Sequence, residues 1–543
     1  MQLHYVEATG QYVLRVPRQD GGLINQLMRE HGLDCYRPSL NEPEVLLMTQ
    51  EPYAAVAFRQ HATPEAIRQL SPIIQAIDES WMTESRAHIC CPADQELFSY
   101  QRAGVEYIMR RGGGLVADAP GLGKTAQAIC VSNEMRAKRV LVICPAAIRL
   151  QWYKAIQQWS TMEWPYTIHP ILSSKNGTHP TAAWTIVSYD LASSDAIGQG
   201  LSEQRFDLLI LDEAHFLKEP LARRTKAIFG GGRERTFHPI ASRCGAVVAL
   251  TGTPLPNRPR ECFVLTRHIC WDAIDWQTEN AFESKYNPRK TIKTRKGIVF
   301  QVDERTGRTH ELQARLRGNF MVRREKRGPG GVLNQLKLPA YDLISMQETT
   351  PVKMALQAES MLHIDPETLE GADAQVLGHI AAVRQQMGVA LAPQVADYVD
   401  MLIDGGEDKL ILFGHHIAVL NILQLKLAKH GLVRIDGSTS TEQRRDRIAK
   451  FIADPGVKIF LGNTQAAGTG VDGLQDVANH VILAEPDWVP GVNQQAIDRA
   501  DRIGQRHSVQ ADFIVAPGSI AERVLASALR KMRNIHNALD SRL

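Results

Sequence analysis

The chain has 543 residues, too many for a single hydrophobic core, so we expect two to four domains. Its 44% hydrophobic and 22% charged residues are typical of a globular protein, and a net charge of +3 excludes a uniformly basic nucleic-acid binder, so any basic surface must be local. Eight scattered cysteines without a C-x-x-C pair argue against a disulfide framework and against a structural zinc site.

Residues 1–90 form the first predicted unit, a small accessory module of the α+β class. Short strands are expected at residues 12–17 and 45–49, and an amphipathic helix at residues 64–80, where Thr63 and Pro64 are typical of a helix start. The module carries no catalytic signature. Recognition of a DNA structure, binding of a protein partner and packing against the next domain are all open roles for it.

Residues 91–270 form the second predicted unit, in which short apolar runs alternate with helices. Continuous apolar strands separated by helices indicate a parallel sheet covered on both faces, which is the α/β class. Ligands of such sheets bind at the carboxyl ends of the strands. Because each polar motif follows its apolar run, we expect the motifs at one edge of the sheet. The runs cover residues 114–118, 140–145, 184–190, 207–215 and 246–253.

The first of these runs leads into LVADAPGLGKT, residues 115–125, a strand followed by a glycine-containing loop and a helix start. In a triphosphate site, Gly121 and Gly123 let backbone N–H groups turn toward phosphate oxygens. Lys124 adds a positive charge, and the hydroxyl of Thr125 can ligate Mg²⁺. The common pattern G-x-x-x-x-G-K-[ST] fails at its first position, which is Asp118. Taken alone, the loop also fits an ordinary strand–turn–helix.

DEAH, residues 212–215, follows the apolar run LLIL directly. At a strand end beside a phosphate loop, Asp212 is suited to hold Mg²⁺, and Glu213 is suited to orient and deprotonate the attacking water. The alternative is a solvated acidic turn. The threonines of TGTP, residues 251–254, are candidates to hydrogen-bond the DEAH carboxylates, although taken alone a plain strand exit is the better explanation.

Residues 271–395 form a predicted helical and basic insertion that links the two larger domains. A solvated, disordered loop explains its charge run as well as a DNA contact does. GPGGV, residues 328–332, has the composition of a hinge or linker. The basic side chains are Lys285, Arg289, Lys290, Lys293, Arg295, Lys296, Arg305, Arg308, Arg323, Arg324, Lys326 and Arg327.

Residues 396–543 form the last predicted unit, where the alternation of apolar runs and helices returns and a second parallel-sheet domain is the simplest interpretation. Residues 494–506, QQAIDRADRIGQR, are predicted to begin a helix on which Arg499 and Arg502 share one face. Arginine suits the charge that develops on a γ-phosphoryl group, whereas an Arg/Asp-rich helix is more commonly a salt-bridged surface. The apolar runs cover residues 409–416, 432–438, 457–464, 480–486 and 510–517.

Taken together, these motifs resemble the Swi/Snf-type ATPases of helicase superfamily 2, and within them the short HARP-like annealing-helicase branch, in a compact form typical of a bacterial or phage member. The resemblance extends from about residue 97 to about residue 526, and the acidic residue at position 118 is itself a feature of the family. The matching segments, in the family's order, are LFSYQRAGV, ADAPGLGKT, VICPAAIRLQW, DEAHFLK, ALTGTPLPN, MVRREKR, RIDGSTSTEQRRDRIAKF, NTQAAGTGVDGLQ and the arginine helix.

The chain departs from the family pattern at Val489, at Asp501, and at Asp472 and Gly473. These departures put the coupling of the second lobe to DNA in doubt. They leave the phosphate, metal and arginine positions intact.

The resemblance implies two RecA-like lobes with ATP and Mg²⁺ in the cleft between them. Thr125 and Asp212 would hold the metal. Lys124, Asp212, Glu213, Arg499 and Arg502 would carry the catalysis. The nucleotide would contact Gln101 as the adenine reader, the loop residues Asp118, Gly121, Leu122, Gly123, Lys124 and Thr125, and Gly470 of the second lobe.

The resemblance further implies ATP-dependent translocation on double-stranded DNA, with fork remodelling or strand annealing as the outcome. A strand-separating DNA or RNA helicase and an ATP-switched DNA clamp or scaffold without processive motion are the alternatives. We expect a monomer that acts on duplex or forked DNA and leaves residues 1–90 available to a protein partner. Candidate DNA-binding residues are Ser188, Thr464, Lys290, Lys293 and Arg295.

The location in the cell follows from what the sequence lacks. No apolar stretch approaches the ~20 residues of a membrane span, and the first residues contain charged side chains where a signal peptide has an apolar core. We therefore expect a cytoplasmic protein that does not contact a membrane.

Overall fold

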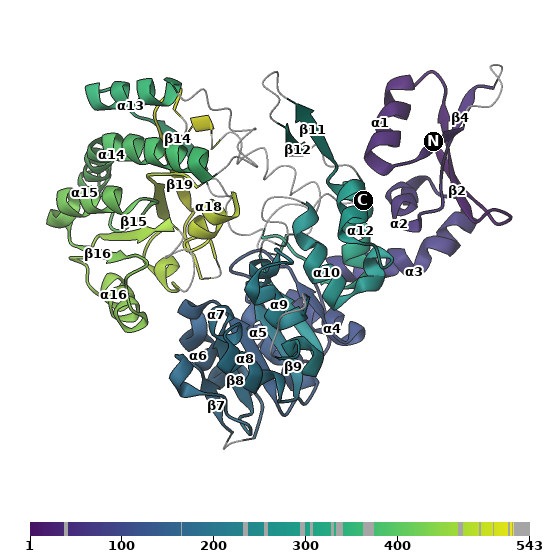
Figure 1. Ribbon diagram of the computed structural model, residues 1–543, viewed down its shortest axis with the longest axis horizontal. Helices are drawn as coiled ribbons and strands as arrows, with labels where there is room; N and C mark the ends of the chain where they lie inside the picture. Colours follow the sequence, from purple (N-terminus) through teal and green to yellow (C-terminus); the bar gives the residue numbers. More distant parts are fainter. Residues whose placement is uncertain are drawn as a thin grey trace.

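A computed structural model describes the chain except for residues 37–41, 164–165, 232–236, 253, 255–258, 294–298, 304–307, 327–330, 333–339, 362–373, 465–470, 488–489, 503, 520–521, 524 and 526–543. The described elements gather into an N-terminal module, a first large sheet with its helices, and a second large sheet with its helices (Figure 1). Among the described residues, no helix is both long enough and apolar enough to cross a bilayer.

The N-terminal module is a four-stranded antiparallel sheet of order β1-β2-β4-β3 covered by helices. The two expected strands and the expected helix are confirmed, and the hydroxyl of Thr63 caps that helix by accepting from the N–H of Ala66 at 3.4 Å. The elements are β1 (Gln2–Val6), β2 (Gln11–Pro17), α1 (Gly21–His31), β3 (Asp34–Tyr36), β4 (Glu44–Thr49), α2 (Pro52–Ala55), the 3-10 helix η1 (Val56–His61) and α3 (Pro64–Trp81).

The first large sheet has seven parallel strands in the order β13-β5-β10-β9-β6-β8-β7. All five strands predicted from apolar runs are confirmed. The two short strands at the edges, β7 and β13, were not predicted. The strands are β5 (Gly114–Val116), β6 (Val140–Cys144), β7 (Ile168–Pro170), β8 (Trp184–Ser188), β9 (Phe206–Asp212), β10 (Cys244–Leu250) and β13 (Met321–Val322).

Helices cover both faces of this sheet, because alternate strand residues enter two separate cores. Leu208 and Ile210 of β9 pack toward α4 (Ser99–Arg111), α5 (Lys124–Glu134) and α6 (Arg149–Trp159). Leu209 and Leu211 pack toward the other helices, which are α7 (Tyr189–Ala192), α8 (Asp195–Ser202), α9 (Arg223–Phe229), α10 (Phe263–Ile269), α11 (Glu279–Tyr286) and α12 (Thr309–Asn319). Short 3-10 turns are η2 (Ala146–Ile148), η3 (Ser174–Asn176), η4 (Ala214–Leu217), η5 (Ile240–Arg243), η6 (Pro259–Cys262) and η7 (Trp271–Ile274).

The segment predicted as a helical insertion also contributes strands. β11 (Arg289–Lys293) and β12 (Val299–Asp303) form an antiparallel hairpin, while β13 joins the first large sheet and β14 (Ala340–Ser345) joins the second. Helix α12 serves two cores, because Leu312 and Leu316 pack in the core of the first large sheet and Ala314 packs in that of the N-terminal module. The domain boundaries derived from the sequence stay a prediction.

The second large sheet has six parallel strands in the order β14-β19-β18-β15-β17-β16, and its five predicted strands are confirmed. Its strand residues again alternate between two cores, with α13, α14 and α15 on one face and α16 and α18 on the other. The elements are α13 (Thr350–Met361), α14 (Ala374–Asp404), β15 (Leu410–Gly414), α15 (Ile417–Leu427), η8 (Ala428–His430), β16 (Leu432–Ile435), α16 (Thr441–Ala453), β17 (Ile459–Asn463), η9 (Leu474–Asp476), β18 (His480–Leu483), α18 (Pro490–Ile497) and β19 (Gln510–Val515).

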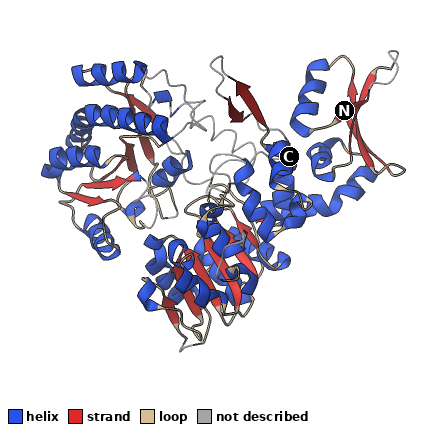
Figure 2. Cartoon of the chain, in the orientation of Figure 1, coloured by secondary structure: helices blue, strands red, loops and turns tan. Residues whose placement is uncertain are grey.

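The expected α/β class is therefore confirmed, with two parallel sheets that each lie between helices (Figure 2). We call the two sheets with their helices lobe 1 (β5–β10 and β13) and lobe 2 (β14–β19). Polar residues follow the carboxyl ends of their strands, the position at which such sheets bind ligands.

Candidate functional site

The predicted phosphate loop connects β5 to α5, which begins at Lys124. Gly121 and Gly123 adopt φ values of +83° and +76°, a region in which other residues are strained. Space is short as well. A Cβ atom on Gly123 would lie 2.3 Å from Nε2 of Gln101, and one on Gly121 would lie 2.6 Å from Cβ of Arg502 in lobe 2. Both positions therefore require glycine, and the loop lies directly against the second lobe.

Lys124 folds back over this loop. Its Nζ donates to the carbonyl oxygen of Asp118 at 2.9 Å, and the side chain is half-buried. Burial lowers the pKa of Lys124, and the negative charges of Glu213, Asp118 and Asp212 counteract that effect. The ammonium is thus bonded to the loop and interacts with the charges at the acidic strand end of β9, as a phosphate site requires. Thr125 follows in the first turn of α5.

The carboxylate of Asp118 is bound within the protein in this conformation. It is buried and accepts from the guanidinium and backbone of Arg324 and from Gln127. Nε of Arg324 lies 2.7 Å from Oδ1, and Nε2 of Gln127 lies 2.9 Å from Oδ2. The side chain therefore anchors the loop from behind. Direct contact with ATP stays a prediction for this residue.

Gln101, the predicted adenine reader, also lies beside the loop. Its Nε2 donates to the carbonyl of Leu122 at 3.1 Å, and its Oε1 accepts from the N–H of Phe98 at 2.9 Å. The hydroxyl of Tyr100 donates to the same Leu122 carbonyl at 3.1 Å. In this conformation the amide of Gln101 fixes the loop, and an adenine contact would require it to exchange partners.

Asp212 and Glu213 stand at the carboxyl end of β9. Oδ2 of Asp212 accepts from the indole N–H of Trp152 at 2.7 Å, and burial together with the neighbouring charge of Glu213 raises the pKa of Asp212 to about 6. Glu213 has a φ of +49°, uncommon for a residue with a side chain and typical of functional sites. A buried carboxylate next to a half-buried one favours a cation beside them.

His215 connects this motif to the neighbouring strand. Its Nδ1 lies 3.3 Å from Oε2 of Glu213 and 3.0 Å from the hydroxyl of Thr251. Burial disfavours the charge of Glu213, but the hydrogen bond and charge of His215, with Lys124 and Arg499, outweigh it and lower the pKa of Glu213. Glu213 is therefore held as a carboxylate, which is the form that a general base needs. Thr253 lies outside the described residues.

The two predicted arginines lie in the turn after α18, which ends at Ile497, so the prediction that they share a helix face is wrong. They are in lobe 2, and Cβ of Arg502 lies against Gly121 of the loop. Nη1 of Arg499 donates to the carbonyl of Val471 at 3.1 Å and lies 3.8 Å from Oδ1 of Asp472. Nη1 of Arg502 donates to the same Oδ1. Burial disfavours the charge of Asp472, but the two arginines outweigh it and lower its pKa. Sequence reasoning noted Asp472 only as a departure from a family pattern and missed this contact.

The candidate DNA-binding residues are placed less favourably. The hydroxyl of Ser188 caps α7 by accepting from the N–H of Leu191 at 3.3 Å, and the hydroxyl of Thr464 donates to the carbonyl of Gly414 at 3.0 Å. Both side chains are buried. Lys290 and Lys293 lie in β11, and only their backbone is described, whereas Arg295 and Gly470 lie outside the described residues. Their DNA and nucleotide roles stay predictions.

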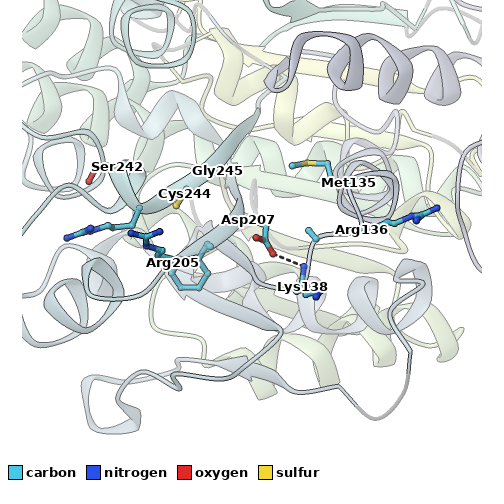
Figure 3. Close-up of a pocket in the computed structure, with 11 residues that line it drawn as sticks. Met135, Arg136, Lys138, Arg205, Asp207, Ser242, Cys244 and Gly245 are labelled. Carbon is cyan, nitrogen blue, oxygen red and sulfur yellow. Dashed lines mark hydrogen bonds between the residues drawn. The ribbon is translucent and has the colours of Figure 1, made fainter.

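A hollow of about 920 Å³ lies elsewhere, at the amino ends of β6, β9 and β10 (Figure 3). Lys138, Arg205 and Cys244 are among its lining residues. This is the opposite end of the sheet from Lys124 and Asp212, so the chemistry of the strand ends, and not the size of a cavity, locates the candidate site.

Comparison with known protein families matches both lobes. Residues 100–341 match the SNF2-related domain, and residues 394–504 match the helicase conserved C-terminal domain. The first match contains the phosphate loop, the DEAH motif and the segment after β13, and the second contains Arg499 and Arg502.

Curated relatives include the DNA annealing helicase and endonuclease ZRANB3 of Mus musculus, 28% identical over 462 residues, with 82% of this chain and 41% of the relative covered. The Bos taurus protein of that name is 30% identical over 465 residues, with the same shares covered. The SWI/SNF-related matrix-associated actin-dependent regulator of chromatin subfamily A-like protein 1 of Bos taurus is 30% identical over 434 residues, with 78% of this chain and 43% of the relative covered. The chain thus spans about two-fifths of these relatives' length.

Among solved structures, the Sulfolobus solfataricus SWI2/SNF2 ATPase core in complex with dsDNA covers 85% of this chain and 100% of its own, with 19% identity and a TM-score of 0.39.

Proposed function

Because the chain belongs to the SNF2-related group of superfamily 2 helicases, we propose that it is an ATP-dependent translocase that hydrolyses ATP between its two lobes and moves on double-stranded DNA. One observation carries this proposal. The phosphate loop of lobe 1 lies against Arg502 of lobe 2, with the loop lysine and the DEAH carboxylates on one side and the two arginines on the other. A site divided between two lobes makes turnover depend on their approach.

The residues also fit a bound Mg²⁺. Asp212 is buried and Glu213 beside it is half-buried, and the pKa of Asp212 is raised to about 6, as expected where a second positive charge would be favourable. Thr125 and Asp212 would hold the ion together with phosphate oxygens, the usual arrangement for Mg²⁺. When bound, the ion would neutralise charge on the phosphates. Because no group of three or more His, Cys, Asp or Glu side chains among the described residues is suited to hold a metal, the ion would depend on phosphate oxygens for its other ligands.

DNA as the substrate is supported by the relatives, two of which are named as DNA annealing helicases. Affinity for duplex DNA would come mainly from phosphate contacts and would therefore fall with salt and vary little with sequence. Fork remodelling or strand annealing is the finer form of the proposal. The cytoplasmic location, the monomeric state and a protein partner for residues 1–90 stay predictions.

The experiment that separates translocation from the alternatives uses two substrates. We expect the protein and ATP to displace the third strand of a triplex while leaving a tailed duplex paired. Strand separation of the tailed duplex without triplex displacement would favour a helicase. If ATP changes the affinity for DNA but no strand is displaced from the triplex or from the tailed duplex, a switched clamp would be favoured. The protein with Glu213→Gln is the matched control, because it should bind ATP and DNA but displace nothing.

A further inference from the structure

Three cations follow β13 within four residues, and all three are buried. They are Arg323, Arg324 and Lys326. Burying a charge costs free energy unless the charge is paired and hydrogen-bonded, so the partners of these side chains show what the segment is built to hold. We call residues 323–326 the connecting segment.

The first half of the connecting segment is bound to the phosphate loop. Arg324 pairs with Asp118 and its carbonyl accepts from the N–H of Ala119 at 3.0 Å. Nη1 of Arg323 donates to the carbonyls of Ala117 at 2.7 Å and Gly252 at 3.1 Å. The segment therefore packs along the start of the phosphate loop and also contacts Gly252, just after β10.

The second half is bound to lobe 2. Nζ of Lys326 lies 2.7 Å from Oδ1 of Asp498 and 3.3 Å from Oδ2 of Asp501, and it also donates to the carbonyl of Asp501. These two acidic residues immediately precede Arg499 and Arg502. Both are buried. Burial and the charge of Asp501 raise the pKa of Asp498, and the positive charge of Lys326 only partly offsets this rise. Without the lysine, two like charges would face each other beside the arginines.

Only one residue separates Arg324 from Lys326, so the contact with the loop and the contact with lobe 2 cannot move far apart. We propose that Lys326 is a positioning residue, which sets Arg499 and Arg502 against the phosphate loop by holding the acidic residue before each of them. The inference rests on the proposed ATPase function. In it, Lys326 couples the phosphate loop of lobe 1 to the arginines of lobe 2. A larger opening of the cleft has to break the Lys326 contacts, and closure has to restore them.

The test compares kcat and KM for ATP at saturating duplex DNA with equilibrium binding of ATP. For Lys326→Met we expect kcat to fall about tenfold or more, because small errors in the placement of reacting groups cost at least this much, while the Kd for ATP stays within about twofold. Lys326→Arg should recover part of the rate, since it restores the cation. Asp498→Asn in the Lys326→Met background should also recover part of it, since one buried unpaired carboxylate is removed.

The control is Lys450→Met, an exposed lysine of α16 in lobe 2, which should leave kcat and Kd unchanged. Rates are expressed per molecule that binds ATP, so that a loss of folded protein does not count as a loss of turnover. Wild-type kcat in Lys326→Met, or equal losses of kcat and ATP affinity in all Lys326 variants, would overturn the positioning role. If the wild-type chain itself hydrolysed no ATP in the presence of DNA, the proposed function would fail.

Discussion

The guanidinium of Arg324 and the carboxylate of Asp118 form an ion pair between residues 206 positions apart in the chain, and neither side chain is exposed to solvent. The pair attaches the strand end after β13 to the loop after β5. It gives a physical reason for an acidic residue where phosphate loops commonly have glycine. The carboxylate serves the conformation of the loop through Arg324 and Gln127, and Lys124 donates its hydrogen bond to the backbone carbonyl of Asp118.

Asp118→Asn should therefore destabilise lobe 1. Removing one partner of a buried pair leaves the other charge uncompensated, which costs about 3–5 kcal/mol. We expect a lower midpoint of thermal unfolding and weaker ATP binding. Arg324→Lys should also lower the midpoint, because lysine cannot bond both carboxylate oxygens in the same plane. An unchanged midpoint in Asp118→Asn would contradict the anchoring role, and Asp446→Asn, in an exposed pair with Arg445, is the control.

Asp472 competes with phosphate for the two arginines, so Asp472→Asn should lower the KM for ATP. The carboxylate is half-exposed, and pairs of this kind contribute about 0.2–1 kcal/mol. We therefore expect a KM about two- to fivefold lower, with kcat largely retained. The rate of hydrolysis measured over a range of ATP concentrations at saturating DNA gives both KM and kcat. A loss of kcat instead would mean that Asp472 arranges the arginines for catalysis.

His480 and Asp512 predict how the stability of lobe 2 depends on pH. Nε2 of His480 lies 2.7 Å from Oδ2 of Asp512, and Glu407 lies 3.3 Å from the other ring nitrogen. Burial disfavours the imidazolium, yet the bond and charge of Asp512 outweigh it and raise the pKa of His480 above its ordinary 6.5. Burial likewise disfavours the carboxylate of Asp512, but the bonds from His480 and Tyr398 lower its pKa below 3.8.

The directions of the two pKa shifts determine how each residue's contribution to stability changes with pH. The contribution of His480 is complete below pH 6.5 and is lost as pH rises through the raised pKa. That of Asp512 is complete above pH 3.8 and is lost as pH falls through the lowered pKa. His480→Gln should therefore lower the unfolding midpoint most between about pH 4 and pH 6.5 and less at pH 9. A difference that stays constant or grows toward pH 9 would contradict the charged pair.

Ten strands of the two large sheets could be predicted because each is a continuous apolar run between helices. Three edge strands were missed. β7 and β13 span only three and two residues and leave no such run, and β14 lies in the segment predicted as a helical insertion. Motif positions also indicated which residues gather at the strand ends. The partner of Asp118 could not be predicted, because pairing across 206 residues leaves no local pattern. The burial of Ser188 and Thr464 depends on packing and was likewise not visible in the sequence.

The central claim is that ATP is hydrolysed by residues of both lobes and that DNA stimulates this reaction. The most direct test is the steady-state rate of ATP hydrolysis with and without duplex DNA, measured for the wild type, Glu213→Gln and Arg502→Ala, with ATP binding measured in parallel. We expect DNA to raise the wild-type rate, and both variants to bind ATP yet lose hydrolysis, one for each lobe. Full DNA-stimulated turnover in either variant, or a wild-type rate that DNA leaves unchanged, would contradict the account.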